Sequence, residues 1–501
     1  MSAEATTPLP AVGREHIPRR RRSSYGGRVP QGAGGPEMSK RTIATALLSS
    51  LLVGASLASP AALAEVQPGS DGQCAQRHLR VPGARHQQVA CLDDLTTTGT
   101  VRTGHTDPAD WAGLTQSALP VPGPVPGIQI DGYFPDTSTT NTNHGWNHDS
   151  QFVIRLPRDW NGGLVVSGTP GNREQYANDR VISDWVLSKG YAFAATDKGN
   201  TGLGFHTDGR RPGDAVAEWN HRVTQLARAA KATVAQHYRR PPSRTVATGL
   251  SNGGYLVRWQ LENHPELYDG GVDWEGTLWS EEGPNLVEYL PKALSAYPRY
   301  ADGGADADAA HAELVAAGFG EGSEFLWPYH YEIYWDLTQR IYREEIDPEF
   351  DGDVVAGIPF CEPGTPACDA DYDYRERPAE VHEAVERIGL TGRIGKPLLT
   401  LHGTLDVLLP ISESSDVYAE MVREQGRGHL HRYYRIADGT HTDSLVDSYP
   451  GRLRALTPCH RTAFEALEAF LADGTPPPVS ATIPRPTDAT PDDLLTTCDL
   501  G

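Results

Sequence analysis

The chain has 501 residues, a formal net charge of −21 and 38% hydrophobic residues. This length allows two or three domains, or one large domain with an insertion, and the hydrophobic content is ample for a core. The acidic excess argues against a nucleic-acid-binding protein, because such a protein needs a basic face to neutralise phosphates. We therefore expect no nucleic-acid partner.

The first 64 residues have the pattern of a targeting segment. A short basic start at Met38 precedes the apolar residues 42–57, and an A-x-A cleavage site ends at Ala64. This order is typical of a secretory signal peptide, and the apolar run is too short and too rich in small residues to predict a membrane span. We expect a secreted, extracellular protein with no membrane contact after cleavage. Residues 1–37 are interpreted as an upstream extension or a mis-assigned start, with a translated disordered basic arm as the alternative.

Cysteine usage agrees with export. An even number of cysteines after a signal peptide predicts disulfides, and pairing between sequence neighbours closes the shortest loops. No spacing matches a zinc site, so we expect no metal. Six cysteines allow fifteen connectivities, of which we expect the sequential one: Cys74–Cys91, Cys361–Cys368 and Cys459–Cys498.

Strands and helices alternate after an irregular N-terminal segment, residues 65–150. Asn161 and Gly162 follow the first strand and are a hairpin signal. The pattern predicts an α/β fold with a mostly parallel sheet and helices on both faces. Strands are expected at residues 152–156, 164–167, 191–196, 244–248, 271–274, 397–401 and 431–436, and helices near 181–188, 216–234, 255–262, 414–423 and 461–471.

The alternation is interrupted at residues 281–395, which we interpret as a cap inserted over the strand ends. The core would then comprise residues 151–280 and 396–475, followed by a Pro-rich tail at 476–501. Most aromatic residues of the insertion are expected to form its own core. We expect Trp327, and Trp274 at the end of a core strand, to contact the substrate.

The motif with the clearest chemistry lies at residues 249–253, which read G-x-S-x-G with Ser251 at the centre. It follows a predicted strand and precedes a predicted helix, as a nucleophile elbow requires. Gly249 and Gly253 fit because only residues with little or no side chain can flank such a sharp turn. The alternative is an ordinary serine in a glycine-rich turn or helix N-cap.

A nucleophilic serine needs a base, and that base needs an acid to orient it. Asp406 follows the predicted strand 397–401, and His441 follows the strand 431–436, in the order serine, acid, histidine. We predict Ser251, Asp406 and His441 as a catalytic triad. Glu275 or Asp273 could instead be the acid, whereas structural roles are favoured for His402, His460 and Asp443.

The oxyanion hole requires two backbone amides beside the nucleophile. The amide of Asn252, directly after Ser251, is expected to supply the first. The second should come from the loop at residues 169–172. Pro170 has no N–H, which leaves Thr169 or Gly171, and we favour Gly171.

These features resemble secreted α/β-hydrolase-fold serine esterases over about 152–280 and 396–472. Within that superfamily the chain is similar to tannase/feruloyl-esterase-like enzymes and to extracellular hydroxybutyrate-oligomer hydrolases. Tannases carry cysteines beside the catalytic serine and histidine, whereas Leu250 and Thr442 occupy those positions here.

The resemblance implies an α/β-hydrolase fold and hydrolysis of a small-molecule or oligomeric carboxylic ester through an acyl-enzyme, without a cofactor. An amidase or peptidase could use the same triad. A third possibility is a non-catalytic binding protein on the same fold, against which the intact Ser-Asp-His order argues. The sequence leaves the oligomeric state open.

Overall fold

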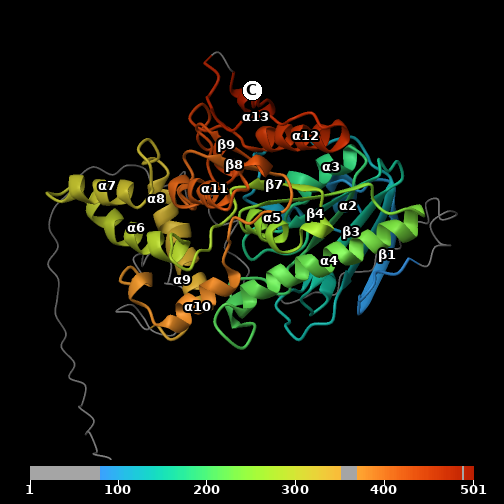
Figure 1. The fold of residues 1–501 in the computed structure, drawn as a ribbon, viewed down its shortest axis with the longest axis horizontal. Helices are drawn as coiled ribbons and strands as arrows, with labels where there is room; N and C mark the ends of the chain where they lie inside the picture. Colours follow the sequence, from blue (N-terminus) through green and yellow to red (C-terminus); the bar gives the residue numbers. More distant parts are fainter. Residues whose placement is uncertain (1–78, 351–368, 488–489) are drawn as a thin grey trace, which may run out of the picture. The chain divides into compact units, whose positions relative to one another are not determined.

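The computed structural model describes residues 79–350, 369–487 and 490–501. In the described chain, ten strands form one sheet in the order β1-β2-β3-β5-β4-β6-β7-β8-β9-β10 (Figure 1). The strands are β1 (His86–Leu92), β2 (Gly127–Tyr133), β3 (Gln151–Pro157), β4 (Gly163–Gly168), β5 (Ala192–Thr196), β6 (Arg244–Leu250), β7 (Gly270–Trp274), β8 (Leu398–Gly403), β9 (His431–Ile436) and β10 (Ala481–Ile483).

Helices fill most connections between the strands. They are α2 (Thr97–Arg102), α3 (Asp184–Ser188), α4 (Asp214–Tyr238), α5 (Asn252–Asn263), α6 (Leu286–Ala301), α7 (Ala307–Ala316), α8 (Trp327–His330), α9 (Asp336–Ile346), α10 (Ala379–Ile388), α11 (Ser415–Glu424), α12 (Thr457–Asp473) and α13 (Pro491–Thr496). None of the helices in the described ranges is both long and apolar enough to cross a membrane.

The sheet is mostly parallel, which confirms the fold class predicted from the alternating pattern. Strands β1, β2 and β3 pair antiparallel, and β3 pairs antiparallel with β5. From β5 through β4, β6, β7, β8 and β9 to β10 every pairing is parallel. The carboxyl ends of these parallel strands therefore meet at one edge, where ligand sites of such sheets form.

The hairpin signal at Asn161 and Gly162 does not join neighbouring strands. Strand β5 lies between β3 and β4, with Phe152 opposite Thr196. Asn161 still shapes a tight local turn, because its side chain accepts from the Gly163 N–H at 2.7 Å. The expected hairpin is wrong because β5 is buried along its whole length, and neighbours on both edges satisfy its backbone.

Helices cover both faces of the sheet, as the pattern predicted. Helices α4 and α5 pack against β4, β5, β6 and β7 on one face, whereas α3 and α12 pack on the other (Figure 1). Because side chains alternate along a strand, successive residues pack into the hydrophobic layers on opposite faces of the sheet. Val165 and Val246 belong to the α12 side, whereas Val166 and Ala247 belong to the α4 side.

The segment between β7 and β8 contains the helices α6 to α10. Its aromatic side chains largely pack on one another: Trp335 lies 4.9 Å from Phe319 and 5.9 Å from Tyr297, measured between ring centroids. Helix α9 also packs against α4, which belongs to the core. The interpretation of residues 281–395 as a cap stays a prediction.

One expected disulfide, Cys459–Cys498, is present and ties α12 to the C-terminal residues. Cys91 is also disulfide-bonded, but its expected partner Cys74 lies outside the described residues, as do Cys361 and Cys368.

Removing the Cys459–Cys498 bridge should destabilise the protein. The cysteines are 39 residues apart, and the chain-entropy model gives about 4 kcal/mol for a loop of this size. The double variant Cys459→Ala/Cys498→Ala should lower the urea unfolding midpoint, and peptide mapping without reductant should recover the linked pair from the unmodified protein. An unchanged midpoint would contradict this expectation.

Candidate active site

Ser251 lies at a strained turn between β6 and α5. Its backbone has φ 60° and ψ −122°, a conformation that non-glycine residues rarely adopt. The flanking glycines make this turn possible. A Cβ on Gly249 would lie 2.5 Å from the carbonyl carbon of Gly253, and one on Gly253 would lie 2.3 Å from the Gly168 oxygen. The local sequence thus forces the Ser251 side chain out of the turn at the carboxyl edge of the sheet.

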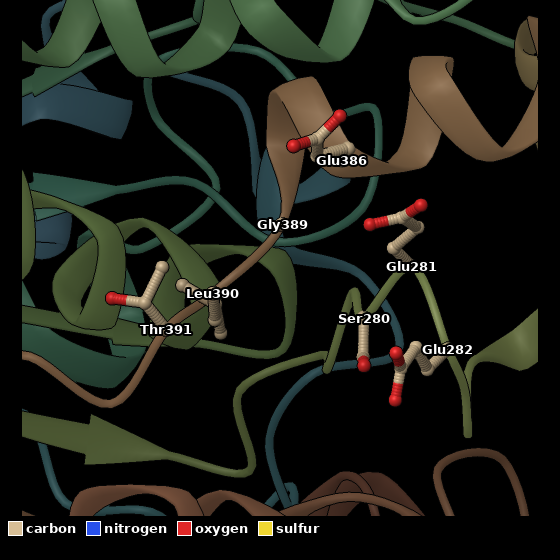
Figure 2. A pocket seen from close by; sticks show the side chains of 7 residues that line it. All are labelled: Ser280, Glu281, Glu282, Glu386, Gly389, Leu390 and Thr391. Carbon is tan, nitrogen blue, oxygen red and sulfur yellow. The ribbon is translucent and has the colours of Figure 1, made fainter. Parts of the chain in front are cut away.

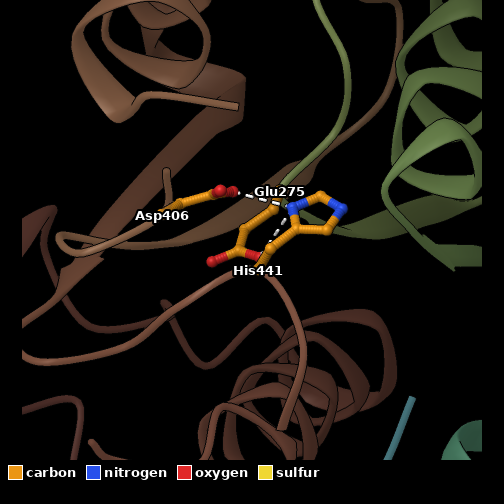
Figure 3. A group of neighbouring side chains, drawn as sticks. All are labelled: Glu275, Asp406 and His441. Carbon is orange, nitrogen blue, oxygen red and sulfur yellow. Dashed lines mark hydrogen bonds and ion pairs between the residues drawn. The ribbon is translucent and has the colours of Figure 1, made fainter. Parts of the chain in front are cut away.

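His441 and Asp406 meet this serine from the loops that follow β9 and β8. The Ser251 hydroxyl donates to His441 Nε2 at 3.0 Å. His441 Nδ1–H in turn donates to Asp406 Oδ2 at 2.8 Å (Figure 3). The carboxylate can only accept, which fixes the proton of a neutral imidazole on Nδ1 and leaves Nε2 as the acceptor. His441 is 6% exposed and Asp406 2% exposed. The structure therefore brings the three residues together in a continuous hydrogen-bonded chain.

Local donors hold Asp406 in its charged form. Its Oδ1 accepts from the N–H groups of Leu408 and Leu409 at 2.8 and 2.9 Å, and His402 Nε2 lies 3.3 Å from Oδ2. Burial alone would raise the pKa of Asp406, but His441 and His402 hold it well below its usual range. His402 is thus a buried support for the acid, in line with the structural role expected for it.

A chain of hydrogen-bonded side chains connects His402 to helix α5. His402 Nδ1 accepts from Ser415 Oγ at 2.7 Å, and Arg258 of α5 donates to the same hydroxyl at 2.7 Å. Arg258 also pairs with Asp273 at 2.6 Å, and both side chains are fully buried. Asp273 is therefore occupied by Arg258 rather than by His441.

His460 and Asp443 also have structural partners. His460 is buried and shares a hydrogen bond with Thr248 Oγ1 at 2.7 Å, and burial lowers its pKa to about 3. Asp443 accepts from the N–H groups of Leu456 and Thr457 at 2.6 and 2.9 Å, at the start of α12. Both therefore act in packing and capping, as expected.

Glu275 differs from these residues, because it lies beside His441. It follows β7, and its Oε2 is 3.7 Å from His441 Nδ1 (Figure 3). Its Oε1 accepts the Gly403 N–H at 2.7 Å, whereas Oε2 is buried without a hydrogen bond. Ligand atoms of Glu275, Asp406 and His441 lie within 4.8 Å of one another, the spacing of a candidate metal group. We assign it no metal, because His441 Nδ1 is already bonded to Asp406.

The loop after β4 lies beside the start of α5. Gly171 has φ 50°, and its carbonyl accepts from Asn252 Nδ2 at 3.3 Å. Lys198, fully buried, supports the loop from below by donating to Thr169 Oγ1 at 2.5 Å and to the Arg173 carbonyl at 3.2 Å. Burial lowers the pKa of Lys198 to about 7. Lys198 thus holds the two ends of the loop, and Asn252 links its middle to the start of α5.

The two tryptophans expected to contact substrate lie in the interior instead. Trp274 is fully buried in the core on the α12 side, with its ring 5.6 Å from His460. Trp327 is fully buried and donates to Ser323 Oγ at 2.9 Å within the segment between β7 and β8. The structure corrects this prediction, because neither side chain can reach a ligand from its packed position. Strand position alone does not tell which face of the sheet a residue occupies.

A surface hollow of about 280 Å³ lies near the start of the inserted segment (Figure 2). Carboxylates from two segments border it, and it includes none of Ser251, Asp406 and His441. We assign it no role. Its lining residues are Ser280, Glu281, Glu282, Glu386, Gly389, Leu390 and Thr391.

Comparison with solved structures places the chain in the α/β-hydrolase fold. The crystal structure of feruloyl esterase B from Aspergillus oryzae aligns with a TM-score of 0.51, at 13% identity, over 81% of this chain and 90% of that one. At this identity the likeness concerns the fold. It confirms the fold class that the resemblance implied.

Family models match two separate parts of the chain. The model described as "Tannase and feruloyl esterase" matches residues 137–273, and the model described as "3HB-oligomer hydrolase (3HBOH)" matches residues 368–500. The first stretch contains Ser251, and the second contains Asp406 and His441. The resemblance stated from the motifs is therefore confirmed.

Curated relatives match over short stretches. The D-(-)-3-hydroxybutyrate oligomer hydrolase of Azoarcus sp. (strain BH72) is 30% identical over 109 residues, which are 20% of this chain and 16% of the relative. The mono(2-hydroxyethyl) terephthalate hydrolase of Piscinibacter sakaiensis is 27% identical over 143 residues, 26% of this chain and 23% of the relative. The chain thus matches less than a quarter of the length of either relative.

Proposed function

We propose that this protein is a secreted serine hydrolase that cleaves carboxylic esters through an acyl-enzyme. The observation that carries the proposal is the hydrogen-bonded chain from Ser251 through His441 to Asp406. A serine, an imidazole and a buried carboxylate in this order supply a nucleophile, a base and an orienting acid. Secretion is supported by the targeting pattern at the N-terminus and by the disulfides.

In the proposed reaction, Ser251 Oγ attacks the carbonyl carbon of the ester while its proton moves to His441 Nε2. Asp406 stabilises the imidazolium that forms and keeps its orientation. Collapse of the tetrahedral intermediate transfers that proton to the leaving alkoxide and leaves an acyl group on Ser251. Water then attacks the acyl-enzyme with His441 again as base. The carboxylic acid is released as His441 returns the proton to Ser251 Oγ, which restores the free serine.

We assign the oxyanion hole to the backbone amides of Asn252 and Gly171. Asn252 is the first residue of α5, and the first N–H groups of a helix have no partner within it. Its side chain ties the helix start to the Gly171 carbonyl, accepts from Thr277 Oγ1 at 2.9 Å and donates to the Tyr342 hydroxyl. These contacts support an oxyanion hole that is already formed before substrate binds. Donors preorganised in this way stabilise the oxyanion most effectively.

A structure of the protein inactivated by a phosphonate would test the assignment. The phosphoryl oxygen of the adduct should lie about 2.7–3.1 Å from the amide nitrogens of Asn252 and Gly171, the distance at which such donors act. An oxygen that points away from residues 169–172 would contradict the role of Gly171. An oxygen that instead lies within hydrogen-bond distance of the Thr169 amide would assign the second donor to Thr169.

The ester class is supported by the relatives, whose names describe hydrolases of hydroxybutyrate oligomers and of mono(2-hydroxyethyl) terephthalate. A panel of p-nitrophenyl esters, phenolic esters, 3-hydroxybutyrate oligomers and matched anilides would test the proposal. We expect turnover of at least one ester class and much slower turnover of the anilides. Faster cleavage of the anilides would favour an amidase, and no turnover together with no covalent labelling would favour a binding protein.

A further inference from the structure

Two buried carboxyl groups face the same nitrogen of His441. Asp406 Oδ2 accepts from Nδ1 at 2.8 Å, and Glu275 Oε2 lies 3.7 Å from it (Figure 3). Asp406 follows β8 and Glu275 follows β7, and both side chains are almost completely buried. The simple triad uses only the first of them, so the second needs an explanation.

Hydrogen bonds hold the backbone of Glu275 and one of its two carboxylate oxygens. Its N–H donates to the Leu401 carbonyl at 2.9 Å, and its Oε1 accepts the Gly403 N–H at 2.7 Å. Oε2 is buried and has no hydrogen-bond partner. A buried polar atom without a partner is costly, and such atoms are rare in folded proteins. Here the unpartnered oxygen is the one that points toward His441.

We propose that Glu275 is a second positioning acid for His441, able to accept its Nδ1 proton when Asp406 does not. The inference rests on the proposed function, since it assigns a role within that triad. In the intact protein Asp406 accepts the hydrogen bond from His441 Nδ1, and Glu275 lies nearby without bonding to the imidazole. A small rotation of the Glu275 side chain would bring Oε2 into hydrogen-bond distance.

The charge state of Glu275 follows from its surroundings. Burial raises the pKa of Glu275 well above the usual range, and the negative charges of Asp406 and Asp443 raise it further. The Gly403 N–H and the Trp274 side chain oppose this shift. With Asp406 ionised, the protonated form of Glu275 is therefore favoured relative to that of an exposed glutamate. Other titratable groups that interact with this cluster are His441, His402, His330 and Tyr289.

When Asp406 loses its charge, Glu275 should take over the orientation of His441. In Asp406→Asn the neutral amide no longer enforces the Nδ1–H tautomer. Once Glu275 loses its proton, its carboxylate can accept Nδ1–H and restore the productive tautomer. Because burial keeps the pKa of Glu275 raised, this rescue should grow as pH increases.

The test is a pH profile of kcat/KM for the wild type, Asp406→Asn, Glu275→Gln and the double variant. Glu275→Gln alone should stay within about 3-fold of the wild type, and Asp406→Asn should lose about 10²–10³-fold at neutral pH, less than the 10⁴-fold expected without a substitute acid. The loss in Asp406→Asn should shrink toward alkaline pH. In the double variant that recovery should disappear, with a further loss of about 10-fold or more.

A merely structural Glu275 would give a different pattern. Its substitution would then cost the same factor in both backgrounds, and Asp406→Asn would lose a constant factor at every pH; either result overturns the inference. Glu281→Gln, an exposed acid shortly after β7, is the matched control and should leave all profiles unchanged. If Glu275→Gln does not fold, the profile of Asp406→Asn decides alone. An inactive wild type would instead refute the proposed function.

Discussion

Ser251→Ala is expected to lower kcat by about 10⁵–10⁶-fold without loss of folding, and His441→Ala by a similar factor. Ser251→Ala removes only the hydroxyl group, which donates to His441 Nε2 at 3.0 Å. The two effects should not add, because nucleophile and base act in one step. Steady-state kinetics on the best ester, with thermal unfolding as a check on folding, measures this.

The matched control is Ser295→Ala, an exposed serine on α6. It should keep the activity of the wild type. Activity of Ser251→Ala within about 10-fold of the wild type would mean that another group attacks the substrate, because loss of a nucleophile costs far more than this.

Arg258→Met is expected to cost about 3–5 kcal/mol of stability, since it leaves the buried Asp273 without its charge partner. Arg258 also donates to Ser415 and lies 4.4 Å from the centroid of the Tyr418 ring. Through Ser415 and His402 the same chain reaches Asp406, so activity should fall in the folded fraction as well. Urea unfolding followed by fluorescence gives the free energy of unfolding.

The double variant Arg258→Met/Asp273→Asn shows how much of the stability loss comes from the unpaired charge and how much from lost packing. Removing both charges should recover part of the loss, because the main cost is an unpaired carboxylate in the interior. A double variant less stable than Arg258→Met would show that the lost packing of α5 against α11 dominates instead.

Much of the site could be predicted because parallel strands end at one edge of a sheet. Ser251, Asp406 and His441 each follow a strand, and the structure joins them by hydrogen bonds. The same logic also placed Glu275 at this edge, after β7. It could not show that Glu275 and Asp406 approach the same imidazole nitrogen, since that depends on side-chain direction rather than on chain order.

The errors have a common cause, which is that sequence patterns report local preference. Asn161 and Gly162 do favour a tight turn, but the partner of β3 is decided by how β5 is buried. Trp274 and Trp327 are large and aromatic, which suits a binding site and a core equally well. Their burial is set by packing between segments distant in the sequence.

Covalent labelling with a fluorophosphonate probe, followed by peptide mapping, tests the central claim most directly. The wild type should react with one probe per chain, and the modified peptide should carry the label on Ser251. His441→Ala should react far more slowly, because Oγ then lacks the base that takes its proton. A label on another residue, or no reaction of the folded wild type, would contradict the assignment of Ser251 as an activated nucleophile.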